Sequence, residues 1–220
     1  MIKFQSNNFE QSPLRVVLNL FPDDEKAIMG TLDDLHNRVR ELPGLTPLSH
    51  TFILCLLAKQ YNQKGMNILE VGTNRGRTSF ILATVAPKAH VTTIDIDKGN
   101  WLFTKELHEN GKAYSELKVT PVDTTVLFGN SAEYLKSYKG PQLDFIFIDG
   151  DHEAGVLTDV LWWNQLKVGG CMMFHDYHNL FPFVEKAVGM LTTLLAREPD
   201  IAFMPDGGLC GFYKDSEEKL

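Results

Sequence analysis

The chain has 220 residues, a net charge of −7 at pH 7, and hydrophobic and charged fractions of 44% and 22%, which fit one folded domain and exclude a disordered chain. The acidic balance argues against a nucleic-acid-binding face, because such faces need clustered Lys and Arg. The three cysteines form no CxxC pair, the N-terminus has no apolar signal segment, and the longest apolar run, residues 52–58, is too short to cross a bilayer, so we expect a cytoplasmic protein without a membrane anchor.

The N-terminal part of the chain predicts two helices. Residues 23–41 carry apolar residues at helical spacing with acids at the start, and Pro43-Gly44 ends this helix. A second helix is predicted from about residue 47 to residue 61. We therefore divide the chain into an N-terminal helical extension over residues 1–62, which could serve as a substrate lid or a homodimer contact, and a second domain over residues 63–220.

From residue 66 onward, short apolar runs alternate with helical windows, which predicts βαβ units and a parallel sheet with helices on both faces. The apolar runs are continuous, as expected for strands covered on both sides. Strands are expected at 66–71, 90–95, 124–129, 143–149 and 171–175. The helices that follow them are expected at 77–86, 99–110, 131–138, 153–166 and 182–197.

The C-terminal segment departs from this alternation. Residues 201–205 and 209–213 flank the turn Asp206-Gly207-Gly208 and predict a hairpin. The predicted fold class is therefore α/β: a Rossmann-like, doubly wound sheet of seven strands, the last one antiparallel, with N-terminal helices.

The segment ILEVGTNRGRTS, residues 68–79, follows the first parallel strand and opens a helix, which is where open α/β sheets bind ligands. Gly72 and Gly76 let the backbone approach a ligand closely. A dinucleotide-binding turn has the pattern G-x-G-x-x-G, whereas Asn74 stands two positions after Gly72 and a third glycine is missing. This difference disfavours an NAD-dependent oxidoreductase, which is kept as an alternative function.

The spacing E-x-G-x-x-x-G, with Glu70 at the strand end, resembles motif I of the class I S-adenosylmethionine-dependent methyltransferases. The resemblance spans roughly residues 48–213. It implies that an acid after the second strand, Asp95, holds the ribose hydroxyls, and that residues after the third strand contact adenine. The cofactor-binding residues that the resemblance implies are Glu70, Gly72, Thr73, Asn74, Gly76, Asp95, Ile96, Asn130, Ser131 and Asp149.

Two later strands also end in chemically active side chains. FIFIDGDHEAG, residues 145–155, and FHDYH, residues 174–178, each end an apolar run with acids and histidine. Because adjacent parallel strands end at the same edge of a sheet, we expect these side chains to converge beside the cofactor. Converging carboxylates repel one another unless a proton or a cation compensates their charge. The converging residues are Asp149, Asp151, His152, His175 and Asp176.

The position of one acid after each strand resembles the catechol and sugar O-methyltransferase branch, including bacterial small-molecule enzymes. This resemblance implies Mg²⁺ or another divalent cation on Asp149 and Asp176. His175, next to Asp176, is included as a candidate third ligand. The match is incomplete, because the catechol type has Asn where this chain has Tyr177, and the sugar type has two consecutive acids where this chain has His175-Asp176. Mg²⁺ prefers oxygen to imidazole.

A metal-free alternative is that His152 or His175 accepts the acceptor's proton while an Asp orients the ring. The predicted catalytic residues are Asp149, His152, His175 and Asp176. We predict a methyltransferase that uses S-adenosylmethionine to O-methylate a small molecule with a hydroxyl group. The remaining alternative is a non-catalytic cofactor-binding module of the same fold.

Other residues are expected to shape the pocket or to be structural. An aromatic-walled acceptor pocket is expected from Trp101, Tyr177, Phe181 and Phe183. Asp159 is expected to pack or to cap a helix. The histidines without a motif partner, which we expect to face solvent or to be structural, are His36, His50, His90 and His108.

Overall fold

The computed structural model describes residues 4–6, 46–97, 124–178 and 181–220. The helices predicted over residues 23–41 and 99–110 lie outside these residues, and so does Trp101.

One eight-stranded sheet forms the centre of the described structure. Strand β8 runs antiparallel to both of its neighbours, whereas all other pairings are parallel. All seven predicted strands are present, and the antiparallel last strand is confirmed. The eighth strand, β1, was not predicted and pairs with β7 at the edge of the sheet. In spatial order the strands are β1 (Phe4–Ser6), β7 (Ile201–Phe203), β8 (Leu209–Tyr213), β6 (Leu166–His175), β5 (Leu143–Ile148), β2 (Asn67–Val71), β3 (His90–Asp95) and β4 (Thr124–Phe128).

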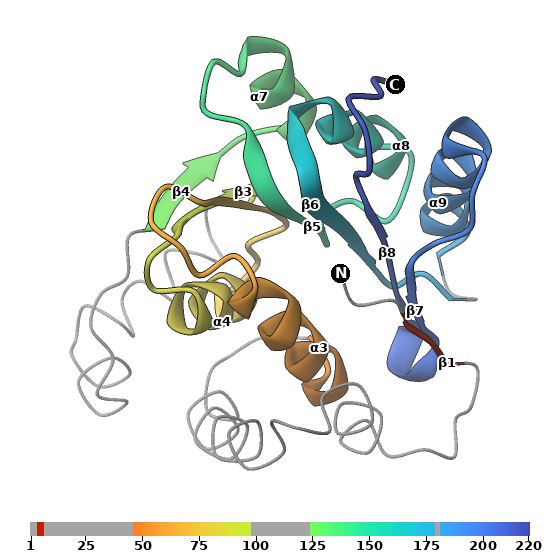
Figure 1. The fold of residues 1–220 in the computed structure, drawn as a ribbon, viewed down its shortest axis with the longest axis horizontal. Helices are drawn as coiled ribbons and strands as arrows, with labels where there is room; N and C mark the ends of the chain where they lie inside the picture. The colour runs from red at the N-terminus through yellow and green to blue at the C-terminus, as the bar shows by residue number, and fades with distance from the viewer. Residues whose placement is uncertain (1–3, 7–45, 98–123, 179–180) are drawn as a thin grey trace.

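Helices cover both faces of the sheet (Figure 1). Helices α3 (Leu48–Lys59) and α4 (Arg77–Val85) lie on one face. Helices α7 (Ser131–Ser137), α8 (Val156–Asp159) and α9 (Pro182–Leu195) lie on the other, with the 3-10 helix η2 (Val160–Gln165). A further 3-10 turn, η3 (Pro205–Gly207), joins the last two strands.

Among the predicted elements that the structure describes, the helix over residues 153–166 differs most from its prediction. It begins only at Val156 and changes to a 3-10 helix at Val160. The late start has a local cause, because the Asp151 carboxylate accepts hydrogen bonds from the backbone N–H groups of Glu153 and Gly155, both at 2.8 Å. Such side-chain bonds compete with the helical pattern.

The alternation of side chains along the strands divides the apolar residues between two cores. In β5, Phe145 and Phe147 pack on the α3 and α4 side, whereas Ile146 and Ile148 pack on the α8 and α9 side. Leu54 and other α3 residues belong to the first of these cores. The described end of the N-terminal extension thus shares a core with the sheet, and the domain division at residue 62 stays a prediction.

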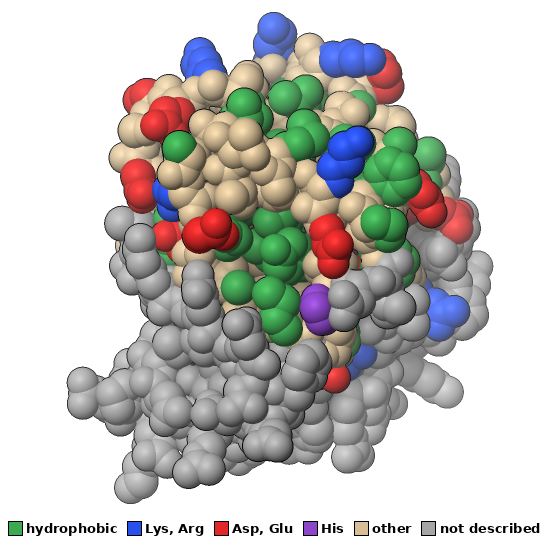
Figure 2. All heavy atoms as spheres, turned by 90° about the vertical axis from the view of Figure 1, so that its right-hand side faces the viewer, with side chains coloured by type: hydrophobic (Ala, Val, Ile, Leu, Met, Phe, Trp, Pro, Cys, Tyr) green, Lys and Arg blue, Asp and Glu red, His purple; other side chains and the backbone are tan. Residues whose placement is uncertain are grey.

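The surface that carries α9 mixes all types of side chain. Figure 2 shows acidic, basic and apolar groups interspersed over its described part. Two apolar residues of α9 are partly exposed there, Met190 and Leu194. Within the described ranges, no helix combines the length and the apolar character needed to cross a membrane.

Candidate active site

A cavity of about 580 Å³ opens at the carboxyl edge of the parallel strands. Its walls come from the segments that follow β2, β3, β4, β5 and β6, as expected for an open α/β sheet. Eight of the ten residues predicted to bind the cofactor and all four predicted catalytic residues line it. The eight are Gly72, Thr73, Asn74, Asp95, Ile96, Asn130, Ser131 and Asp149.

The glycine turn, residues 72–76, is shaped by its contact with the end of β5. Gly72 has a φ of 100°, and a Cβ atom there would lie 2.0 Å from the carbonyl oxygen of Asp149. The backbone N–H of Asp149 donates to the carbonyl of Val71 at 2.7 Å. Glycine is therefore required at position 72 for the approach of two strand ends. Gly76, with a φ of 80°, precedes the first turn of α4 and lies outside the cavity lining.

Glu70 also lies outside the cavity lining, because strand alternation turns its side chain toward the α3 and α4 face. It is fully buried. One carboxylate oxygen accepts a hydrogen bond from the Thr93 hydroxyl at 2.5 Å, and the Thr93 and Thr73 hydroxyl oxygens lie 2.5 Å apart. Burial raises the pKa of Glu70 to about 8. The structure thus places Glu70 beneath the glycine turn, linked to it through two threonines.

Asp95 is held at the cavity wall by the backbone. One oxygen accepts from the N–H of Asn74 at 2.5 Å and the other from the N–H of Asp97 at 2.7 Å. Asn74 has a φ of 45°, a left-handed conformation that Asn tolerates better than most residues. Beside Asp95, the side chain of Ile96 is 77% exposed and lines the same cavity. This corner therefore combines an oriented carboxylate with an apolar surface.

The opposite wall of this corner is formed at the start of α7. The side chain of Asn130 caps the helix by accepting from the N–H of Ala132 at 2.8 Å. The Ser131 hydroxyl oxygen accepts from Nε1 of Trp162 at 2.7 Å. Asp159 lies in the same corner, and burial raises its pKa to about 6. Asp159 was expected to be structural, and the structure places it in the cavity wall.

The sequence interpretation missed several lining residues. Arg75, Arg77 and Thr78 belong to the segment of the glycine turn, so their position near the cavity could have been read from the motif. Thr46 has no such signal, because it reaches the site only through the packing of α3 on α4, where its hydroxyl oxygen lies 2.9 Å from that of Thr78.

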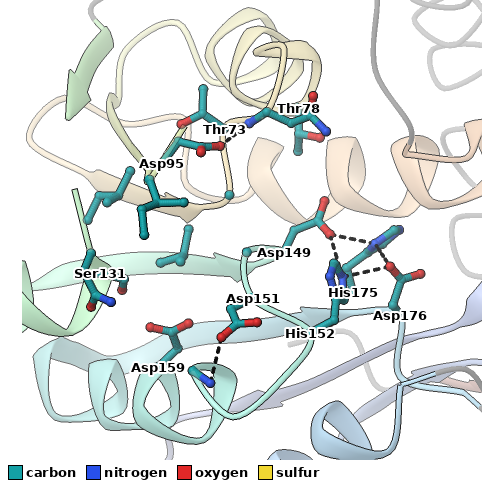
Figure 3. A pocket seen from close by; sticks show the side chains of 18 of the residues that line it. Thr73, Thr78, Asp95, Ser131, Asp149, Asp151, His152, Asp159, His175 and Asp176 are labelled. Carbon is teal, nitrogen blue, oxygen red and sulfur yellow. Dashed lines mark hydrogen bonds and ion pairs between the residues drawn. The ribbon is translucent and has the colours of Figure 1, made fainter. Parts of the chain in front are cut away.

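The four predicted catalytic residues form one group, here named the His/Asp cluster: Asp149, His152, His175 and Asp176. Figure 3 shows it on the side of the cavity away from Asp95 and Ser131. Nδ1 of His175 lies 2.8 Å from Asp149 Oδ1 and 3.2 Å from Asp176 Oδ2. Nε2 of His152 lies 2.9 Å from Asp176 Oδ2 and 3.7 Å from Asp149 Oδ1. Each ring nitrogen therefore faces both carboxylates.

These contacts change the protonation of the cluster. Contact with Asp149 and Asp176 raises the pKa of His152 to about 9. Burial opposes the charge on His175, but the same two carboxylates outweigh it and raise the pKa of His175 to about 10. Burial also opposes the charge on Asp176, yet the two imidazoles hold the pKa of its carboxyl well below the usual range. With protein groups alone, the two carboxylates thus favour the protonated form of both rings.

A third histidine contacts the His/Asp cluster through His175. His50, on α3, is fully buried, and its Nδ1 lies 2.9 Å from Nε2 of His175. The two rings meet edge to face, with centroids 4.9 Å apart. His50 was expected to be structural or solvent-facing, and the structure gives it a direct hydrogen bond to a site residue.

The predicted aromatic wall is partly described. The ring of Phe181 lies 4.4 Å from that of His152, centroid to centroid. Tyr177 and Phe183 are partly buried and pack against the core beside α8 and α9. Of these three residues, Phe181 is the one with a described ring contact to the His/Asp cluster.

Residues 69–177 match the model of a family described as "Methyltransferase domain". No curated protein matches the sequence significantly. The fold is similar to that of a candidate caffeoyl-CoA O-methyltransferase from Staphylococcus aureus, with a TM-score of 0.62, 21% identity, and coverage of 91% of this chain and 98% of that one.

Two further structures were solved with the methyl donor or its product. One is the S-adenosylhomocysteine-bound methyltransferase PaMTH1 from Podospora anserina, with a TM-score of 0.58, 15% identity and coverage of 96% and 100%. The other is the O-methyltransferase TomG of tomaymycin synthesis from Streptomyces achromogenes, in complex with S-adenosylmethionine, with a TM-score of 0.58, 14% identity and coverage of 96% and 100%.

At these identities the structural likeness establishes the fold, and the family model adds the sequence pattern. Neither supports the oxidoreductase alternative. Residues 69–177 thus match a methyltransferase domain, and the chain has the fold of structures solved with S-adenosylmethionine or S-adenosylhomocysteine.

Proposed function

We propose that the protein transfers the methyl group of S-adenosylmethionine to a hydroxyl oxygen of a small molecule. The observation that supports this most strongly is that one cavity holds both the glycine turn with Asp95 and the His/Asp cluster. The first group suits an adenosyl ligand, and the second suits an acceptor that must lose a proton.

The donor end is the part of the cavity formed by the glycine turn, Asp95, Ile96 and Ser131. Each carboxylate oxygen of Asp95 accepts one backbone N–H and keeps the capacity to accept another hydrogen bond. The carboxylate can therefore accept both hydroxyls of a ribose. The exposed side chain of Ile96 offers an apolar surface for the adenine ring.

The acceptor end is the His/Asp cluster with Phe181 beside it. The donor carries a methyl group that its sulfonium already activates, so the protein contributes mainly position. As the oxygen–carbon bond forms, the carbon–sulfur bond breaks and the hydroxyl proton must leave. The His/Asp cluster is the group of side chains at this end of the cavity that can hold that proton. A divalent cation on the cluster would make the hydroxyl more acidic.

Donor binding is tested by calorimetry with S-adenosylhomocysteine. The wild type should bind, and Asp95→Asn should weaken binding about 10-fold or more, because a charged hydrogen-bond acceptor is lost. The control Asp97→Asn leaves the backbone N–H to Asp95 in place and should bind normally. Absence of binding by the wild type at millimolar ligand would contradict the proposal.

Acceptor chemistry is tested with S-adenosylmethionine that carries an isotopically labelled methyl group. The acceptors are a panel of catechols and sugars, together with analogues in which an amine replaces a hydroxyl group. The proposal expects label in methyl ethers, identified by mass spectrometry. Label that appears only in the amines would leave a methyltransferase but refute transfer to oxygen.

A further inference from the structure

We propose that the His/Asp cluster is a binding site for a first-row transition-metal ion such as Mn²⁺, Fe²⁺, Co²⁺ or Zn²⁺, in preference to Mg²⁺, with His152 as one of four ligands. This inference concerns the acceptor end of the proposed methyltransferase. Metal binding can be measured without donor or acceptor, so the two proposals can fail separately.

The first argument is geometric. The four ligand atoms, two imidazole nitrogens and two carboxylate oxygens, all lie within 4.8 Å of one another. The nitrogen–oxygen distances between them run from 2.8 to 3.7 Å. A tetrahedral ion with bonds of about 2.0 Å separates its ligands by about 3.3 Å. The nitrogen–oxygen pairs are therefore already close to this separation, and the widest pair of ligand atoms must shorten by at most about 1.5 Å.

The second argument is the burial and hydrogen bonding of two ring nitrogens in the cluster. Nε2 of His152 and Nδ1 of His175 are buried and make no aligned hydrogen bond, although carboxylate oxygens lie within ion-pairing distance. His175 is only 6% exposed. Buried polar atoms normally have an aligned partner. These nitrogens point between the carboxylates, which is the direction expected for a shared ligand.

The third argument is the support behind the ligands. If Nδ1 of His175 binds an ion, its Nε2 must carry the proton and donate to Nδ1 of His50, which lies 2.9 Å away. Metal-bound histidines usually make such a bond with the second ring nitrogen. Asp176 is held with a φ of 54°, and Gly207 leaves room for its carboxylate, because a Cβ there would lie 2.8 Å from Oδ1. Both ligands are therefore oriented before any ion arrives.

The donor atoms decide the type of ion. Imidazole nitrogen suits Zn²⁺, Fe²⁺, Co²⁺ and related ions, whereas Mg²⁺ prefers a shell of oxygen ligands. The two carboxylates supply the charge that balances a divalent ion when both rings are neutral. His175 and His152 replace the oxygen ligands that a magnesium site would need at these positions.

The test uses full-length protein freed of metal with a chelator. Calorimetry with Co²⁺, Zn²⁺, Mn²⁺ and Mg²⁺ should show one equivalent of bound transition metal, at least about 10-fold tighter than Mg²⁺. Bound Co²⁺ should give visible absorption bands that report nitrogen ligands. Equal affinity for Mg²⁺, or no metal binding by protein that still binds S-adenosylhomocysteine, would overturn the proposal.

Variants separate the roles of the histidines. His152→Gln should lower Co²⁺ affinity and change the Co²⁺ spectrum, whereas His90→Gln, on β3 and outside the cavity lining, should do neither. His50→Gln should keep the spectrum but weaken binding about 10- to 100-fold. Thermal melts and S-adenosylhomocysteine binding confirm that each variant is folded. Wild-type affinity and spectrum in folded His152→Gln would refute His152 as a ligand.

Discussion

The two ends of the cavity are held in place by different parts of the chain, one by backbone groups and the other by side chains. The donor end depends on backbone: Gly72 and Asn74 have positive φ values, and Asp95 is held by two main-chain N–H groups. The acceptor end depends on side chains that meet from separate elements, with His175 from β6 and His50 from α3. Substitutions at the donor end should therefore affect folding first, and those at the acceptor end should affect chemistry first.

The largest effect is expected from Gly72→Ala. Its Cβ atom would force β2 and β5 apart, and the residue has a φ of 100°, so we expect a loss of at least about 3 kcal/mol in the free energy of unfolding. Urea denaturation measures this. Gly65→Ala is the matched control, because Gly65 has a φ of 86° but open space around it, and it should lose only about 1–2 kcal/mol. Equal losses would show that the strand contact is unimportant.

At the acceptor end, Asp176→Asn should separate chemistry from folding. We expect kcat to fall about 100-fold or more, because a charged group of the His/Asp cluster is lost, while the affinity for S-adenosylhomocysteine stays within a few-fold of the wild type. Steady-state kinetics and calorimetry provide the two readouts. Glu153→Gln, exposed in the neighbouring loop, is the control and should leave both unchanged. If Asp176→Asn also lost affinity for S-adenosylhomocysteine, the claim that the two ends of the cavity act separately would be wrong.

Glu70 gives the donor end a pH dependence of stability. Its pKa is raised on folding, from 4.5 to about 8, so the folded state disfavours the charged carboxylate. Stability should therefore fall as pH rises between these values, by up to about 1.4 kcal/mol per pH unit. Glu70→Gln should flatten this decline in chemical denaturation at several pH values. Glu133→Gln, exposed on α7, should retain the wild-type slope, and a retained slope in Glu70→Gln would contradict the assignment.

The smallest effect is expected from a pair of tryptophans behind the donor end. Trp162 donates from Nε1 to Ser131, whereas the buried Nε1 of Trp163 has no hydrogen-bond partner. Trp162→Phe should therefore cost about 1 kcal/mol more stability than Trp163→Phe. Thermal unfolding measures the stability of both variants. The two substitutions remove nearly equal buried area, so the difference reports the hydrogen bond. Equal destabilisation would mean that the bond to Ser131 contributes nothing.

Much of the fold could be predicted from the chain because its signals are local. Apolar runs predict the seven strands, and Asp149 and His175 are expected at one edge of the sheet because they end two parallel strands, β5 and β6. The same reasoning could not orient Glu70, because a strand that is apolar on both faces does not show which side chains point to which helix layer. Strand β1 was missed because three residues carry no periodic pattern.

By itself, the sequence determined the α/β class, the glycine turn and the residues that end each strand, because these depend on neighbours along the chain. Only the tertiary structure decided that Glu70 lies beneath the turn, that Asp159 lines the cavity, and that His50 bonds His175 across 125 positions. Those outcomes depend on strand register and helix packing, which bring together side chains with no relation in sequence.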